Sequence, residues 1–113
     1  MDDNSILRKV IRYAGKIIGY TKNTESYDLF KQDMVLVEAC VFNLIQIGEL
    51  SNRLDPAYKN MHPEIPWRSI TSLRNRIVHD YEGVNFSLIW DIIQDDLPEL
   101  IDSLNKLMDQ PRL

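Results

Sequence analysis

Apolar residues recur at intervals of three and four positions along most of the chain, which predicts amphipathic helices and no convincing strand. The first helix is expected over residues 5–21, where the apolar positions are Ile6, Leu7, Val10, Ile11, Ala14, Ile17 and Ile18. Three more helical segments follow, with expected starts near Tyr27, Pro66 and Asn85. The pattern therefore predicts an all-α fold, an up-down bundle of four to five helices.

The second helix is expected to continue from Tyr27 to Arg53, because only the isolated Gly48 interrupts it. At ~1.5 Å per residue, such a helix is about 40 Å long. Its apolar residues between Met34 and Ile47 spread around most of the circumference, which is more than one core-facing stripe requires. A helix of this kind needs two partner surfaces, so the sequence predicts a homodimer built on it.

The last two helices carry signals for their ends. The third is expected to begin at Pro66 and to continue to about Asp80, with Gly83 as the stop signal. The fourth is expected to begin near Asn85, and Pro98 should kink it or divide it into two.

Composition and charge narrow the possible functions. The 113 residues suit one domain over residues 1–113. A net charge of −4 excludes a polycation that coats nucleic acid, so any anion-binding site must be local. Cys40 has no partner cysteine and is expected to fill the core. The N-terminus lacks a signal-peptide pattern, and Met34–Leu50 contains polar residues that argue against a membrane span, so we expect a soluble cytoplasmic protein with no membrane contact.

One face of the first helix is basic. Arg8, Arg12 and Lys16 are spaced four residues apart and therefore stack on one side, and no acidic residue occurs between Asp3 and Glu25. The sequence leaves two interpretations open for this face, which are a solvated surface and a surface for phosphate groups or an acidic partner.

The third helix is a second basic segment, since residues 67–79 contain three arginines and no acid. On a helical wheel its core face is formed by Ile70, Leu73, Ile77 and Tyr81. The outward face carries Arg68, Ser72, Asn75, Arg76 and His79, with Arg74 on the flank nearer the core. Asn75 and His79 are expected to be neighbours at four-residue spacing.

These side-chain types suit phosphodiester cleavage without a metal. An arginine offers a planar fork for a phosphate, an asparagine can orient that phosphate, and a histidine titrates near neutral pH and can transfer protons. Attack by a ribose 2′-hydroxyl is helped by a base and an acid, and each helix offers only His79, so two helices across a dimer axis would supply both. The alternative for His79 is a solvated surface residue.

The run from Arg74 to Tyr81 resembles the Arg-x4-His-x-Tyr signature of the HepT-like proteins, a branch of the HEPN superfamily. Further matches are Gly48-Glu49 in the long helix, Ile65-Pro66-Trp67 before the signature, and Trp90 and Leu97-Pro98 after it. The resemblance covers about residues 30–104, and the ordered set of motifs is far more specific than Arg-x4-His alone.

The resemblance implies a ribonuclease toxin of a type VII toxin–antitoxin pair, which acts as an all-helical dimer and needs no metal or other cofactor. It implies that Arg74 holds the scissile phosphate and His79 transfers protons in a cleft at the dimer interface, with Asn75 in support. Arg68 and Arg76 are the further predicted RNA contacts. The family's partner is an MntA-type nucleotidyltransferase, which uses Mg²⁺ and ATP to transfer AMP to the signature tyrosine, Tyr81 in this chain.

Other interpretations remain open. On an ideal helix Tyr81 points toward the core, so an acceptor role requires the helix to end before it, and the alternative is an aromatic residue at the edge of the core. His62 is expected at a loop surface, and Glu49 is expected to make a polar contact on its helix. For the whole chain, the alternative function is a non-catalytic helical subunit that docks a nucleotidyltransferase.

Overall fold

The structure is a computed structural model that describes residues 2–79 and 83–109. In chain order its elements are α1 (Asp3–Thr21), α2 (Tyr27–Gln32), α3 (Met34–Asn52), α4 (Pro56–Met61), α5 (Trp67–Thr71), α6 (Leu73–Ile77), β1 (Val78–His79), β2 (Gly83–Val84), α7 (Phe86–Asp91), the π-helix η1 (Ile92–Asp96) and α8 (Leu97–Met108). The predicted all-α class is confirmed.

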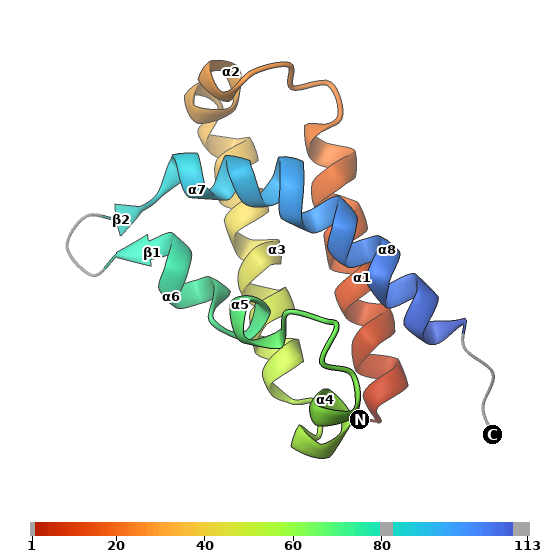
Figure 1. Ribbon diagram of the computed structural model, residues 1–113. Helices are drawn as coiled ribbons and strands as arrows, with labels where there is room; N and C mark the ends of the chain where they lie inside the picture. Colours follow the sequence, from red (N-terminus) through yellow and green to blue (C-terminus); the bar gives the residue numbers. More distant parts are fainter. Residues whose placement is uncertain (1, 80–82, 110–113) are drawn as a thin grey trace.

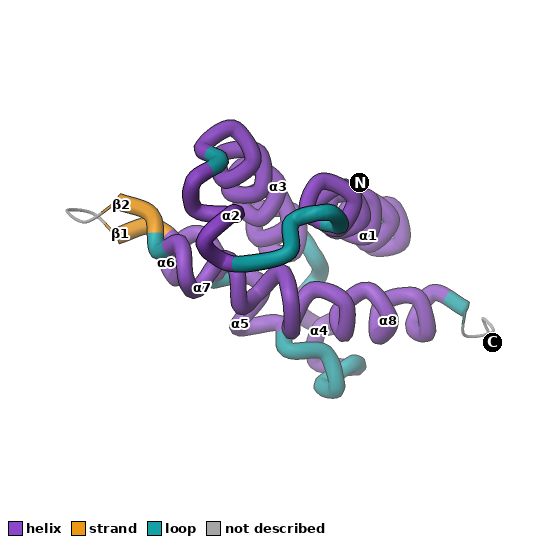
Figure 2. The backbone as a smooth tube through the Cα atoms, turned by 90° about the horizontal axis from the view of Figure 1, so that it is seen from above, coloured by secondary structure: helices purple, strands orange, loops and turns teal. Residues whose placement is uncertain are grey.

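α3 lies in the middle of the bundle. It packs against α1 on one side and against α5 and α6 on the other, while α7, η1 and α8 run as one long segment across the front (Figure 1). The view from above agrees, with α1 and α6 on opposite sides of α3 (Figure 2). This arrangement separates the basic face of the first helix from the basic segment after Pro66.

The first helix begins two residues earlier than predicted and ends where predicted. Asp2 caps it, because the Asp2 carboxylate accepts a hydrogen bond of 2.8 Å from the backbone N–H of Ser5. The residues that face α3 and α8 are buried: Ile6, Leu7, Val10, Ala14, Ile17 and Thr21.

The predicted helix from Tyr27 to Arg53 is wrong in one respect, because the chain breaks at Asp33. The Asp33 backbone is non-helical (φ −98°, ψ 87°), and its carboxylate accepts a 3.1 Å hydrogen bond from the N–H of Leu36. This capping bond starts a new helix, so α3 is 19 residues, or about 28 Å, long rather than about 40 Å.

The fourth helical segment continues through Pro98, and its regular α-helix is interrupted by a π-helix just before that residue. Asn85 caps its start by accepting a hydrogen bond from the N–H of Leu88. The five residues before Leu97 form a π-helix, and Pro98 then occupies the first turn of α8, where its missing N–H leaves no helical bond unmade.

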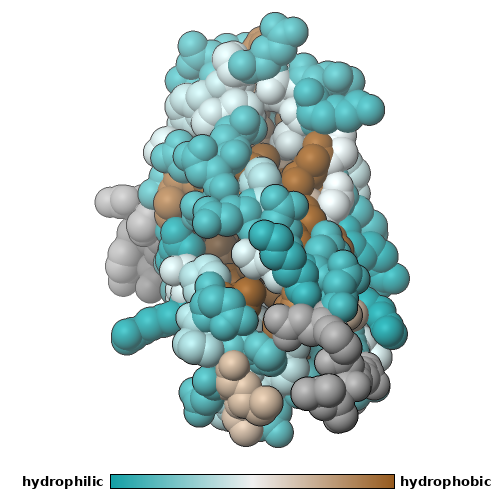
Figure 3. Space-filling view, turned by 45° about the vertical axis from the view of Figure 1, so that its right-hand side comes forward, coloured by the Kyte–Doolittle hydropathy of each residue, from teal (hydrophilic) through white to brown (hydrophobic). Residues whose placement is uncertain are grey.

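By length and composition, α3 passes the test for a helix that could cross a membrane, contrary to our expectation that its polar residues exclude a span. Its packing gives the apolar character another explanation, since Cys40, Leu44 and Ile47 are fully buried against the neighbouring helices. The molecule is mostly hydrophilic on the face that Figure 3 presents, with apolar side chains visible between polar ones. α3 is therefore the central helix of a globular bundle.

Candidate active site

The short helices α5 and α6 attach to α3 through Gly48. A Cβ atom at that position would lie 3.2 Å from the carbonyl oxygen of Ile70 and 3.6 Å from the Cβ of Leu73, so only glycine allows this approach without a shift. The Asn52 side-chain amide, one turn later on α3, donates a 3.3 Å hydrogen bond to the carbonyl of Thr71. α3 therefore determines where the basic segment lies.

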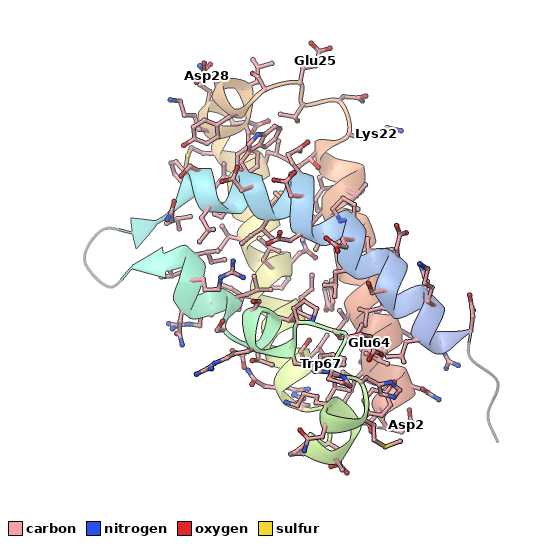
Figure 4. All side chains as sticks on the ribbon, viewed as in Figure 1. Asp2, Lys22, Glu25, Asp28, Glu64 and Trp67 are labelled. Carbon is pink, nitrogen blue, oxygen red and sulfur yellow. The ribbon has the colours of Figure 1, made fainter. Side chains whose placement is uncertain are left out.

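The loop before α5 is held by aromatic contacts. Trp67 lies close to Glu64 at the base of the bundle (Figure 4), and its indole donates a 2.9 Å hydrogen bond to the carbonyl of His62. The Tyr58 ring lies 4.7 Å from the His62 ring. The His62 imidazole is half-buried and lies 3.4 Å from a Glu64 carboxylate oxygen, so it is less exposed than predicted. Burial is the main cause that raises the pKa of the Tyr58 hydroxyl. The hydrogen bond from Trp67 to His62 anchors the start of α5 to this loop.

A break at Ser72 divides the predicted third helix into α5 and α6. The Ser72 hydroxyl donates a 2.7 Å hydrogen bond to the carbonyl of Arg68, one turn earlier, and the backbone at Ser72 (φ −95°, ψ 7°) departs from the α-helix. The predicted core residues Ile70, Leu73 and Ile77 are all buried, as expected.

Arg74 and Asn75 are exposed on α6. The wheel placed Arg74 on the flank nearer the core, and its exposure shows that this flank is open to solvent. Among the described residues, no ion pair or side-chain hydrogen bond engages its guanidinium group. Arg68, on α5, is exposed as well. These groups can meet a ligand from solvent.

The expectation that the third helix continues to Asp80 is wrong, because α6 ends at Ile77. Val78 is extended (φ −115°, ψ 120°) and pairs with Val84, and His79 pairs with Gly83 in a two-stranded antiparallel ladder. The ladder closes onto the helix through a 2.8 Å hydrogen bond from the N–H of Asn85 to the carbonyl of Ile77. This short hairpin also corrects the prediction that the chain has no strand.

The position of His79 follows from this hairpin. An extended backbone at residues 78–79 removes the four-residue helical spacing that placed His79 above Asn75. The His79 backbone lies in β1, two residues after α6 ends at Ile77, and is therefore close to Arg74 along the chain. Gly83, opposite it, has a φ of +77°, which is the left-handed region that glycine adopts without strain. Tyr81 lies outside the described residues, as does the side chain of His79.

The structure turns Arg76 away from Arg74. Its guanidinium donates a 3.1 Å hydrogen bond to the carbonyl of Ser69, and its half-buried side chain lines a pocket of about 350 Å³ between α5–α6 and η1–α8. Three carboxylates, those of Glu64, Asp96 and Glu99, line the same pocket. These carboxylates would repel an RNA phosphate, so the position of Arg76 does not favour the predicted RNA contact. That contact stays a prediction.

Three large apolar residues of α3 are exposed, Met34 at its start and Val35 and Phe42 on one face seven residues apart. Val35 is 80% exposed and Phe42 is 58% exposed. Val35 and Phe42 form a narrow exposed strip, with Glu38 and Glu49 exposed alongside it, and the homodimer on this helix stays a prediction. Glu49 makes no hydrogen bond or ion pair with the described residues, so its expected polar contact within the helix is absent from them.

Comparison with known proteins gives a consistent result. The family described as "Ribonuclease HepT-like" matches residues 10–107. "Putative RNase TTE0752" of Caldanaerobacter subterraneus subsp. tengcongensis is 32% identical over 87 residues, which cover 77% of this chain and 78% of that protein. "Putative RNase MJ0127" of Methanocaldococcus jannaschii is 29% identical over 107 residues (95% and 88%), and "Probable ribonuclease HepT" of Thermococcus cleftensis is 38% identical over 61 residues (54% and 56%). No solved structure matches the chain.

Proposed function

We propose, because the chain belongs to the HepT-like ribonuclease family, that it is a metal-independent endoribonuclease and the toxin of a cytoplasmic toxin–antitoxin pair. The observation that carries the proposal is the position of the signature. Arg74 is exposed on α6, and the backbone of His79 lies in β1, two residues beyond the end of that helix. This proximity along the chain supports the proposal that a phosphate-binding cation and a proton-transfer group act together at one edge of the bundle.

The proposed reaction breaks one P–O bond. The Arg74 guanidinium binds the scissile phosphate through two parallel hydrogen bonds and stabilises its developing charge. One neutral His79 accepts the proton of the ribose 2′-hydroxyl, whose oxygen attacks phosphorus and forms a 2′,3′-cyclic phosphate. A protonated His79 of a second copy donates its proton to the departing 5′-oxygen, so one proton is taken up and one is released.

A second copy is needed because each chain provides one histidine in the signature. We propose that the exposed strip around Val35 and Phe42 on α3 is the homodimer surface, since burying large apolar side chains drives association. α3 holds α5 and α6 through Gly48, so a dimer on α3 sets the two signatures relative to each other. Asn75 supports phosphate binding, and Arg68 is the further RNA contact proposed from α5.

The proposed antitoxin is an MntA-like nucleotidyltransferase. The hydroxyl oxygen of Tyr81 would attack the α-phosphorus of ATP and release pyrophosphate, with Mg²⁺ held by the transferase. The attached AMP adds negative charge and bulk two residues from His79, where it opposes RNA binding by repulsion and by occupying space.

Cleavage of a labelled RNA in EDTA tests the catalytic proposal. We expect unmodified protein to cut, and we expect His79→Ala and Arg74→Ala to remain folded and to lose cleavage. Lys59→Ala is the matched control, because it removes a cation far from the signature on α4 and should cut normally. Intact mass shows whether Tyr81 carries AMP. Unmodified dimer that does not cut would reject the enzyme and favour the non-catalytic docking subunit.

The dimer surface has its own test. Phe42→Asp should convert the dimer to a monomer in sedimentation measurements while the circular dichroism spectrum stays helical, because Phe42 contributes little to the core of one chain. Because the proposed reaction needs a histidine from each of two copies, Phe42→Asp alone should also lose cleavage. A Phe42→Asp protein that stays dimeric would place the interface elsewhere.

A further inference from the structure

The basic face of α1 has features that the proposed active site does not use. Arg8, Arg12 and Lys16 are all exposed on successive turns, at the end of which Lys22 also points away from the bundle (Figure 4). No ion pair joins any of these four to the described residues. Like charges at four-residue spacing destabilise an isolated helix, so this arrangement does not contribute to the stability of α1.

Two glycines lie within the same face. At ~100° per residue, Gly15 and Gly19 are within about 20° of Arg8 around the helix. Both are exposed, and a Cβ at either position would meet nothing within 4 Å. Glycine inside a helix is unfavourable compared with alanine, and no neighbouring element requires it at these positions. Their effect is to leave a strip of bare backbone between the cations, which a ligand can approach closely.

An exposed aromatic ring borders the strip. Tyr20 is 48% exposed, on the side of α1 where Lys16 lies. Lys16 itself lies with its ammonium 5.4 Å from the centre of the Tyr13 ring. Cations that follow a backbone, combined with aromatic faces on which bases stack, are the features by which proteins bind single-stranded nucleic acid without sequence preference.

We infer that this face, called the α1 ridge (Arg8, Arg12, Gly15, Lys16, Gly19 and Tyr20), is a binding track for single-stranded RNA. The step of four residues between its cations is about 6 Å along the helix, similar to the separation of successive phosphates in a single strand. An acidic protein surface would use the cations alone, whereas RNA also uses Tyr20 and the bare backbone. The identity of this ligand rests on the proposed ribonuclease function.

The ridge and the signature lie on opposite sides of α3 in one chain (Figures 1 and 2). The ridge is therefore a contact for RNA remote from the bond that is cut. Its role is to raise the affinity for long strands, and the two sites can be tested separately.

The probe is a fluorescein-labelled 2′-O-methyl RNA of about 20 nucleotides, longer than the roughly 4–16 nucleotides that one single-strand-binding fold covers. It lacks the attacking hydroxyl and stays intact with the full chain. The triple variant Arg8→Gln, Arg12→Gln, Lys16→Gln should reduce the slope of log K against log salt by about 2, which is about 100-fold in affinity at about 0.1 M salt. The control Lys31→Gln, Lys59→Gln, Lys106→Gln changes the net charge equally on α2, α4 and α8, and it should keep the slope nearly unchanged.

Stacking is tested at Tyr20. Tyr20→Ala should weaken binding about tenfold or more, whereas Tyr20→Phe keeps the ring and should bind like wild type. Equal loss in the ridge and control triples, or an unchanged slope in the ridge triple, would overturn the inference. A ridge triple that binds RNA normally but loses an acidic protein partner would assign the ridge to that partner instead. Cleavage without ridge dependence rejects the ridge alone, and ridge-dependent binding without cleavage rejects the ribonuclease alone.

Discussion

Replacing the two ridge glycines with alanine should stabilise the protein. Each glycine lowers the stability of a helix interior by about 0.5–1 kcal/mol relative to alanine. No atom lies within 4 Å of the Cβ that either substitution would add, so the gain is not offset by a clash. The free energy of unfolding of the double variant Gly15→Ala, Gly19→Ala should therefore be about 1–2 kcal/mol higher than that of wild type. This corresponds to a rise of several degrees in Tm for a domain of this size.

The assay is urea unfolding followed by circular dichroism at 222 nm, with all variants at one protein concentration, because association makes the apparent stability concentration-dependent. Gly48→Ala is the matched control in another helix. Its Cβ would lie 3.2 Å from the Ile70 carbonyl oxygen, a backbone atom that cannot rotate away, so we expect this variant to lose stability. If the double variant were less stable than wild type, Gly15 and Gly19 would have to pack against something outside the single chain.

Two further predictions concern the core. Ile77→Asp should destabilise the bundle by on the order of 4 kcal/mol, because Ile77 is fully buried and the new carboxylate would have no partner. As a control, Asn75→Asp at an exposed position should change the free energy of unfolding by less than about 0.5 kcal/mol. Equal unfolding midpoints for the two variants would contradict the assigned core face. Burial raises the pKa of the Cys40 thiol to about 12, from an ordinary value near 9, so the native state holds the proton that the unfolded state releases. This contribution to stability is complete below pH 9 and is lost as the pH rises from about 9 toward 12, and Cys40 should resist alkylation at pH 8 in native protein but react in urea. Rapid native alkylation would show that Cys40 is accessible.

The helices could be predicted because their signals are local. Asp2 and the apolar period of α1 specify that helix without help from the rest of the chain. The break at Asp33 is also a local signal, an aspartate that precedes an apolar run, but no proline or glycine marks it. Cap residues therefore deserve equal weight with periodicity in long apolar segments.

The geometry of the signature could not be predicted, because it depends on contacts between distant residues. A helical wheel assumes one uninterrupted helix, yet Ser72 breaks the segment, and Arg76, which the wheel placed on the outward face, is half-buried with its guanidinium bonded to the Ser69 carbonyl. β1 and β2 have two residues each, too few for a period, and their pairing joins Val78 to Val84 across the hairpin. The family resemblance named Arg74 and His79, whereas the wheel's prediction that His79 neighbours Asn75 on one helix is wrong because residues 78–79 are extended.

Gly48 also has a consequence for communication within the molecule. The helix that presents Phe42 to solvent is the helix against which the Ile70 backbone rests, with Asn52 bonded to Thr71 beside it. This contact is close, since a Cβ atom at Gly48 would lie only 3.2 Å from the Ile70 carbonyl oxygen. We therefore expect a rotation of α3, caused by a partner on its outer surface, to shift α5 and α6 and with them Arg74. α3 therefore connects its exposed outer surface mechanically to the segment that carries Arg74.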